Sequence, residues 1–135
     1  MPHLVILYTP NLEAEADMGT LCRALADTML AVRDEQDNPV FPIGGTRVLA
    51  YPAAHYAVAD GQADHGFVYL NVRMAQGRSA AVHQDIGDCL SSVVRRHFAP
   101  LFARRHLGLT LQIDESAGQV YDAKLGNLHP LFNKA

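Results

Sequence analysis

Pro2 is the residue of this chain whose type and position best suit acid–base chemistry. It follows Met1 and opens an apolar run that ends at Tyr8. Methionine before a small residue such as proline is usually removed, so we expect Pro2 to carry a free secondary amine. A free α-amino group titrates near ~7.7–8.0, and burial lowers its pKa because the charged form is disfavoured. Pro2 is therefore predicted to be a general base near neutral pH. The alternative is that Pro2 is an ordinary terminal residue. A proline has no backbone N–H to donate to a neighbouring strand, so it is tolerated at the start of a strand.

Three short motifs follow Pro2 along the chain. Residues 40–47 read VFPIGGTR, residues 59–62 read ADGQ and residues 76–79 read QGRS. With the Met-Pro-His start, their order and spacing resemble the 5-carboxymethyl-2-hydroxymuconate Δ-isomerases of the tautomerase superfamily, from residue 2 to about residue 115. The resemblance implies an isomerase that uses its amino-terminal proline as a base, binds a small carboxylate substrate and needs no cofactor or metal.

Two arginines occupy positions at which the family pattern has substrate-binding arginines. Arg47 begins the second expected strand, and Arg78 begins the second expected long helix. A guanidinium group binds a carboxylate through two parallel hydrogen bonds and stays charged, and the free amides at a helix start also favour an anion. The resemblance therefore implies that both arginines hold substrate carboxylates. Taken alone, each would be a surface ion pair or a solvated charge.

The sequence departs from the family pattern near Arg47. A second arginine is expected two positions later, where this chain has Leu49, and the next expected aromatic or histidine pair is Tyr51-Pro52. The polar loop around residues 33–39 is also longer than usual. These differences change the polarity and shape of the expected pocket, so its substrate need not be the one that names the family.

Periodicity predicts the elements that position these residues. Apolar runs or alternating patterns indicate strands at residues 4–8, 46–51, 66–74 and 107–113. Helical spacing from Asn11 to Val32 predicts one helix with Met18, Cys22, Leu25 and Met29 on its buried stripe. A second helix is expected to begin at Ser79, to bury Val82, Ile86, Cys89, Val93 and His97, and to kink or stop at Pro100.

This order of elements predicts an α+β, tautomerase-like fold. Two βαβ units would form one sheet with both helices on one face. We expect one domain over residues 1–116, with halves at about 1–60 and 61–116, and a tail over 117–135 that a neighbouring subunit could order. The other sheet face is aromatic and apolar, which predicts self-association, and the resemblance implies a homotrimer.

Composition excludes several other classes of protein. The net charge of −3 argues against a nucleic-acid partner. No apolar run approaches the ~20 residues of a membrane span, and no secretory signal is recognisable, so a cytoplasmic location is expected. Cys22 and Cys89 are read as free thiols. The seven histidines form no HExxH pattern, so no metal site is predicted. The basic residues at 95–97 and 104–106 are expected near the end of a helix, where positive charge interacts favourably with the helix dipole, so they are not read as a binding site.

The leading functional hypothesis is an enol–keto isomerase. Unprotonated Pro2 would remove the proton of a 2-hydroxymuconate-type di- or tricarboxylate and return it further along the conjugated chain, while Arg47 and Arg78 hold the carboxylates. A second hypothesis is a hydratase or dehalogenase that uses the same proline to protonate an added water. A third is a non-catalytic trimeric binding protein that keeps only the fold.

Overall fold

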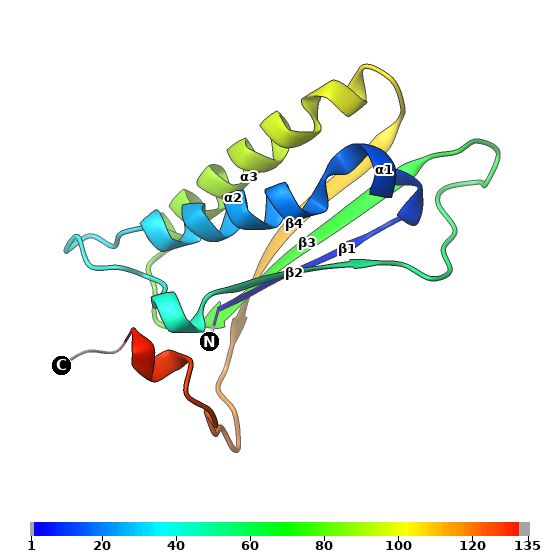
Figure 1. The fold of residues 1–135 in the computed structure, drawn as a ribbon. Coiled ribbons are helices and arrows are strands. Elements are labelled where there is room, and N and C mark those ends of the chain that lie inside the picture. Colours follow the sequence, from blue (N-terminus) through cyan, green and yellow to red (C-terminus); the bar gives the residue numbers. More distant parts are fainter. Residues whose placement is uncertain (1, 133–135) are drawn as a thin grey trace.

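The computed structural model describes residues 2–132, and a single mixed sheet organises them. Its four strands are β1 (His3–Tyr8), β2 (Arg47–Pro52), β3 (Gly66–Ala75) and β4 (Leu107–Ser116), in the spatial order β2-β1-β3-β4. The two outer pairs, β1 with β2 and β3 with β4, are parallel, and β1 is antiparallel to β3. This topology is that of two βαβ units, which confirms the predicted α+β architecture (Figure 1).

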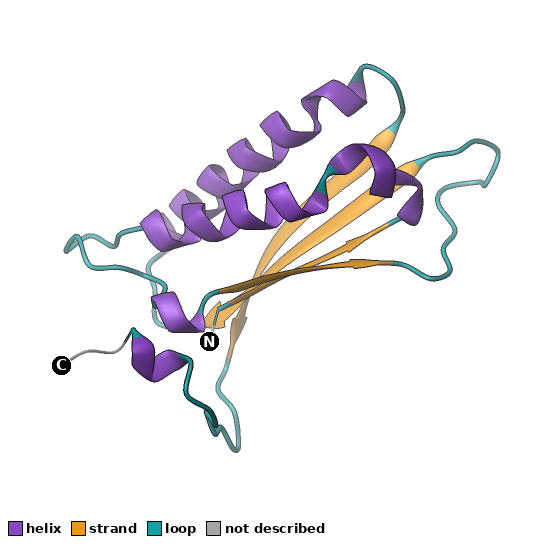
Figure 2. Ribbon diagram, viewed as in Figure 1, coloured by secondary structure: helices purple, strands orange, loops and turns teal. Residues whose placement is uncertain are grey.

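Both long helices cover one face of the sheet. Helices α2 (Met18–Ala31) and α3 (Ala80–Phe102) lie side by side over the strands (Figure 2). The alternation predicted for β3 is confirmed, because one set of its side chains is buried beneath the helices: Val68, Leu70, Val72 and Met74. The other set belongs to the opposite face, which no element of residues 2–132 covers in this way. We call that second face the open face.

The predicted first helix is interrupted. A 3₁₀ turn (Pro10–Leu12) and the short helix α1 (Glu13–Ala16) precede Asp17, whose φ of 45° breaks the helix before α2 begins. An aspartate tolerates this left-handed conformation because its short side chain bonds locally. Its carboxylate accepts hydrogen bonds from the amide and the hydroxyl of Thr20 and thereby caps α2. The expectation of one continuous helix was wrong, and Asp17 is the physical reason.

Helix α3 begins as predicted and ends later than predicted. The Ser79 hydroxyl accepts a hydrogen bond from the Val82 amide, so Ser79 is the N-cap. Pro100 lies inside the helix, which continues to Phe102. Its missing N–H removes only one bond near the helix end, and the buried Leu101 side chain holds the last turn in place.

The buried stripe predicted for α2 is confirmed apart from one residue. Met18, Leu25 and Met29 are buried, whereas Cys22 is only partly buried and Leu21 lies in the core.

The stripe predicted for α3 is only partly correct. Val82 and Ile86 are buried as predicted, but Cys89, Val93 and His97 are only partly buried. The other side chains of α3 in the core are Leu90, Val94, Phe98 and Leu101. After its first turns the predicted stripe is thus about one residue away from the true one, since cysteine and histidine were counted as core residues.

The C-terminal tail leaves β4 and returns beneath the sheet edge (Figure 1). Its 3₁₀ turn, η3 (His129–Leu131), packs on another 3₁₀ turn, η2 (Ile43–Gly45), which precedes β2. Between β4 and η3, the side chains of Val120, Tyr121 and Leu125 are almost fully exposed. The tail contacts the rest of its own chain at η3 and at the Ala117 carbonyl, which accepts a hydrogen bond from the Gln76 amide at 3.4 Å. The apolar segment between these two points is exposed.

We expect Gly44→Ala to release the tail. A Cβ atom at residue 44 would lie 2.9 Å from the backbone Cα of His129, so η3 would have to move. Limited proteolysis should cut residues 117–128 several-fold faster than in the wild type, while the melting temperature changes little because the core is untouched. Gly19→Ala is the matched control, because its Cβ would meet nothing closer than 3.9 Å. Equal cleavage of both variants would show that this contact does not hold the tail.

Candidate active site

One edge of the sheet gathers the predicted site residues. The parallel strands β1 and β2 begin at this edge, and β3, which is antiparallel to β1, ends there with its partner β4. Pro2 immediately precedes β1 and is buried. Arg47 begins β2 and pairs in register with His3, one residue after Pro2. The structure thus places Pro2 and Arg47 at neighbouring positions on adjacent strands.

A row of polar side chains crosses the open face at this edge. Strand register aligns Arg47 with His3, His3 with Arg73, and Arg73 with Asp114. We call these four residues the charged row. Burial lowers the pKa of His3, and the positive charges of Arg47 and Arg73 lower it further. Both effects favour the neutral form of the His3 imidazole, which lies between the two arginines in the row.

Within residues 2–132, the guanidinium group of Arg47 has no acidic partner. Its one hydrogen bond among the described residues runs from Nη1 to the Gly45 carbonyl, at 3.3 Å. No carboxylate of residues 2–132 lies within salt-bridge distance of it. A half-buried arginine with free donors is well suited to bind an external carboxylate.

Arg78 has a different environment. Its Nη2 donates to the Val40 carbonyl at 3.1 Å, and its Nη1 lies 3.6 Å from a carboxylate oxygen of Asp34. The neighbouring Ser79 hydroxyl donates to Glu35, which is in the same loop. Arg78 therefore fastens the loop between α2 and η2 to the start of α3. About a third of its side chain remains exposed, so the group also reaches solvent.

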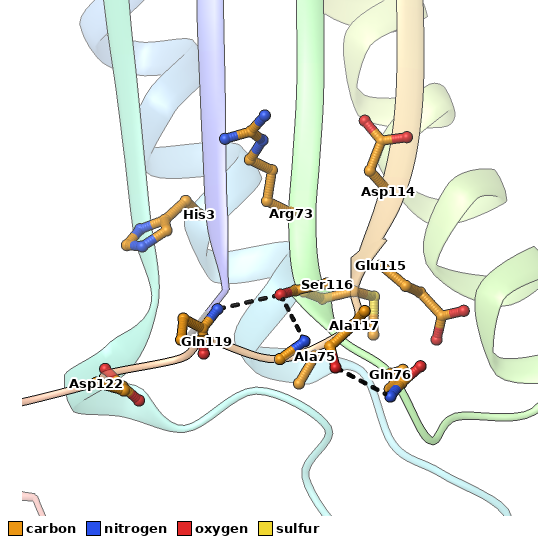
Figure 3. Close-up of a pocket in the computed structure, with 12 residues that line it drawn as sticks. His3, Arg73, Ala75, Gln76, Asp114, Glu115, Ser116, Ala117, Gln119 and Asp122 are labelled. Carbon is orange, nitrogen blue, oxygen red and sulfur yellow. Dashed lines mark hydrogen bonds between the residues drawn. The ribbon is translucent and has the colours of Figure 1, made fainter.

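A cavity of about 590 Å³ opens beside the charged row. Side chains of His3 and Arg73 line it from the sheet, and the chain from Ser116 to Gln119 forms its floor (Figure 3). Pro2, Arg47 and Arg78 are not among the residues that line it. Sequence reasoning did not assign Arg73 or Gln119 to a site. The strand alternation put Arg73 on the open face, but only the register shows that it pairs with His3.

The carboxylates around this cavity already have partners. Asp114 accepts a hydrogen bond from the Asn71 amide at 2.8 Å, and Asp122 pairs with Lys124 at 2.7 Å. Glu115 lies 3.1 Å from Nε2 of His83 on α3, although the two are not aligned for a hydrogen bond. Among residues 2–132, Arg47 and Arg73 form no salt bridge, so both guanidinium groups at this edge keep donors for an external carboxylate.

Two other classes of site receive no support from residues 2–132. In this part of the chain no three side chains of the metal-binding types gather closely enough to hold an ion. Burial raises the pKa of both thiols, Cys22 and Cys89, which keeps them in the unreactive protonated form. The same described region has no helix with the length and apolar character needed to cross a membrane.

Comparison with known proteins places these features in a family. Residues 2–132 match the family model for 5-carboxymethyl-2-hydroxymuconate isomerase, which extends the resemblance into the tail. The chain is 30% identical to the 5-carboxymethyl-2-hydroxymuconate Delta-isomerase of Escherichia coli over 98% of its own length and 99% of the relative's.

Two crystal structures of proteins with this activity in their names are also similar. One is 56% identical, with a TM-score of 0.94 over 100% of this chain and 95% of the other. The second, from Deinococcus radiodurans R1, is 36% identical, with a TM-score of 0.84 over 98% and 95%. The chain therefore belongs to the 5-carboxymethyl-2-hydroxymuconate isomerase family, and it is an isomerase.

Proposed function

We propose that this isomerase catalyses enol–keto proton transfer on a 2-hydroxymuconate-type di- or tricarboxylate, with Pro2 as the general base. The observation that carries the proposal is the burial of Pro2 beside the start of β2, where Arg47 has an unneutralised guanidinium group. Burial and a nearby cation both disfavour a protonated amine, which lowers its pKa toward the working pH. 5-Carboxymethyl-2-hydroxymuconate is the substrate in the names of the similar proteins, and we propose it as the first to be tested.

The reaction needs only one proton to be moved. Neutral Pro2 takes the proton of the 2-hydroxyl group, and the oxygen lone pair forms the keto C=O bond. The electron pair of the conjugated system shifts away from the oxygen, and a carbon further along the chain takes the proton back from the Pro2 ammonium. The substrate and product are isomers, so no oxidant, reductant, water or cofactor is consumed.

The arginines are proposed to orient the substrate and to stabilise its charge. Arg47 offers free donors on the strand next to Pro2, so it would bind the carboxylate nearest the reacting enol and the negative charge that develops there. Arg78 would bind a second carboxylate through its exposed part while it retains the Val40 carbonyl. We also propose that the enzyme acts in the cytoplasm on a small-molecule substrate.

A direct assay tests the proposal. Dienol substrates absorb in the ultraviolet, so their conversion to the conjugated ketone is followed spectroscopically against the uncatalysed rate. We expect acceleration with 2-hydroxymuconate or its carboxymethyl homologue. Assays with 3-chloroacrylate distinguish the second hypothesis, because a dehalogenase would release chloride. Release of chloride without ketonisation would replace the proposal, and inactivity on all of these compounds would favour a binding protein.

We further propose a homotrimer held together through the open face. The middle and far parts of this face expose Leu7, Leu49 and Tyr51, each at 44–50% of its full area. A contiguous apolar surface of this kind is costly in water and is usually covered by another subunit. The charged row lies at the sheet edge, beyond these residues. A neighbouring subunit can therefore bury the apolar part of the open face and leave the charged row beside a solvent-filled cavity.

Leu7→Glu is expected to dissociate this trimer. Burying an unpaired carboxylate in an apolar contact is strongly unfavourable. Light scattering should show three times the chain mass for the wild type and a monomer for the variant. The matched control is Ser92→Glu, which places the same charge at an exposed position of α3, on the other side of the sheet, and should leave the mass unchanged. A wild-type monomer at micromolar concentration would contradict the proposed assembly.

A further inference from the structure

We propose that Arg73 is a specificity-determining residue, which binds the carboxylate of the substrate most distant from the enol, on the open face and opposite Arg47 across His3. This inference rests on the proposed function and assigns part of its substrate recognition to a residue outside the family motifs described above. The ligand chemistry is a di- or tricarboxylate, with one carboxylate at Arg47 and another at Arg73, on either side of His3.

Strand register brings the three nitrogen-bearing side chains together. His3 pairs with Arg47 on one side and with Arg73 on the other, so the three residues lie on consecutive strands and on one face. Neighbouring strands are ~4.8 Å apart, so the backbones of the two arginines are separated by about 10 Å. A backbone separation of this size leaves room for an extended six-carbon diacid between two arginine side chains.

Asn71 holds Arg73 in a binding orientation. The Asn71 side chain is 6% exposed, and its amide oxygen accepts a hydrogen bond from Nε of Arg73 at 3.2 Å. Its amide nitrogen donates to Asp114 at 2.8 Å. The carboxylate in register with Arg73 is thus bonded to Asn71, and among the described residues Arg73 has no salt bridge. Figure 3 shows the guanidinium directed over β1 and away from Asp114.

The free donors of Arg73 open onto enough space for a substrate. With Nε occupied by Asn71, both Nη groups remain for a two-bond contact with a carboxylate. The adjoining cavity of about 590 Å³ is larger than a small tricarboxylate. The cavity is also lined by the carboxylates of Asp114, Glu115 and Asp122, of which Asp114 is bonded to Asn71 and Asp122 to Lys124. A substrate carboxylate is therefore expected at the Nη groups of Arg73, which form no salt bridge within residues 2–132.

Substrates that differ in carboxylate number test the inference. For the wild type and for Arg73→Met, kcat and KM are measured with 5-carboxymethyl-2-hydroxymuconate and with 2-hydroxypenta-2,4-dienoate, which has one carboxylate. We expect Arg73→Met to lower kcat/KM for the tricarboxylate roughly ten- to a hundredfold, mainly through KM. The value for the monocarboxylate should stay within about twofold, and Arg73→Lys should recover part of the loss. Arg95→Ala, at an exposed position on α3, is the control.

Two kinetic results would overturn the inference. An equal loss with both substrates would mean that Arg73 acts on the fold or on the base, and no loss with either would mean that it binds nothing. Melting temperatures of all variants separate unfolding from lost binding, and Arg73→Lys replaces Arg73→Met in the comparison if the latter does not fold.

A second readout keeps the inference separate from the proposed function. If the wild type converts neither substrate, trans,trans-muconate is titrated into the protein while the His3 imidazole signals are followed by NMR. A saturable shift in the wild type that is lost in Arg73→Met would uphold the carboxylate site although the proposed reaction had failed. No shift in the wild type would overturn the site itself.

Discussion

Protein that keeps Met1 is expected to have no measurable isomerase activity. In the extended chain the Pro2 nitrogen is part of an amide, which has no basic lone pair and carries no exchangeable proton. Two preparations test this result: one in which a protease leaves Pro2 as the first residue, and one in which a single extra residue remains. Intact mass identifies each. Because general acid–base catalysis contributes typically ~10²–10⁴-fold, the difference should be at least two orders of magnitude.

The pH dependence of the processed enzyme should identify the same group. A base must be neutral to accept a proton, so the rate should rise with pH along one ionisation and then reach a plateau. Burial and a neighbouring positive charge both disfavour a protonated amine, so we expect the pKa of the Pro2 amine to be lowered. The midpoint should therefore lie below the ordinary value of ~7.7. A midpoint above that value would mean that another group titrates.

Pro2→Ala provides the matched control for the amine. The variant has a primary amine in the same place, which is more basic and less well fixed, so activity should fall but survive in part. Its fold should be unaffected, since residue 2 precedes the first ladder pair. Full activity in protein shown by mass to carry Met1 would eliminate Pro2 as the base.

The sheet was predictable because its strands carry strong local signals. In β3, every second side chain from Val68 to Met74 is buried, and this alternation alone indicates one covered face. Ser79 was likewise readable as a helix cap. The break at Asp17 was not, because the same acidic residue also suits the first turn of an uninterrupted helix. Only the left-handed backbone at that position distinguishes the two arrangements.

The candidate site was only partly predictable for a related reason. Pro2 and Arg47 lie close together because two parallel strands begin at the same edge, and that follows from the order of elements. Arg73 is far from both in sequence, and its position opposite His3 depends on the register of an antiparallel pair. The contacts of Arg78 with Val40 and Asp34 depend on a loop path that no periodic pattern specifies.

Replacing Arg47 is expected to separate substrate binding from stability. Arg47→Ala should raise KM for a dicarboxylate enol roughly ten- to over a hundredfold, because losing a charge-assisted bond typically costs ~1.5–3 kcal/mol. Its melting temperature should change little, since its one intramolecular hydrogen bond is long and only half-buried. Arg95→Ala, on the exposed side of α3, should alter neither quantity.

Arg78→Ala is expected to change both quantities, and this difference follows from its partners. The variant leaves the carbonyl of the buried residue Val40 without a donor, which costs about 1–2 kcal/mol of unfolding free energy. The pair with Asp34 adds little, because the two groups are 3.6 Å apart and solvent screens them. Denaturant unfolding measures the stability, and steady-state kinetics measures KM in the same variants.

A loss of stability without a change in KM would restrict Arg78 to holding the loop and would leave Arg47 as the motif arginine that binds the substrate. Equal effects at residues 47, 78 and 95 would instead remove the site from this edge of the sheet, because only the first two lie there.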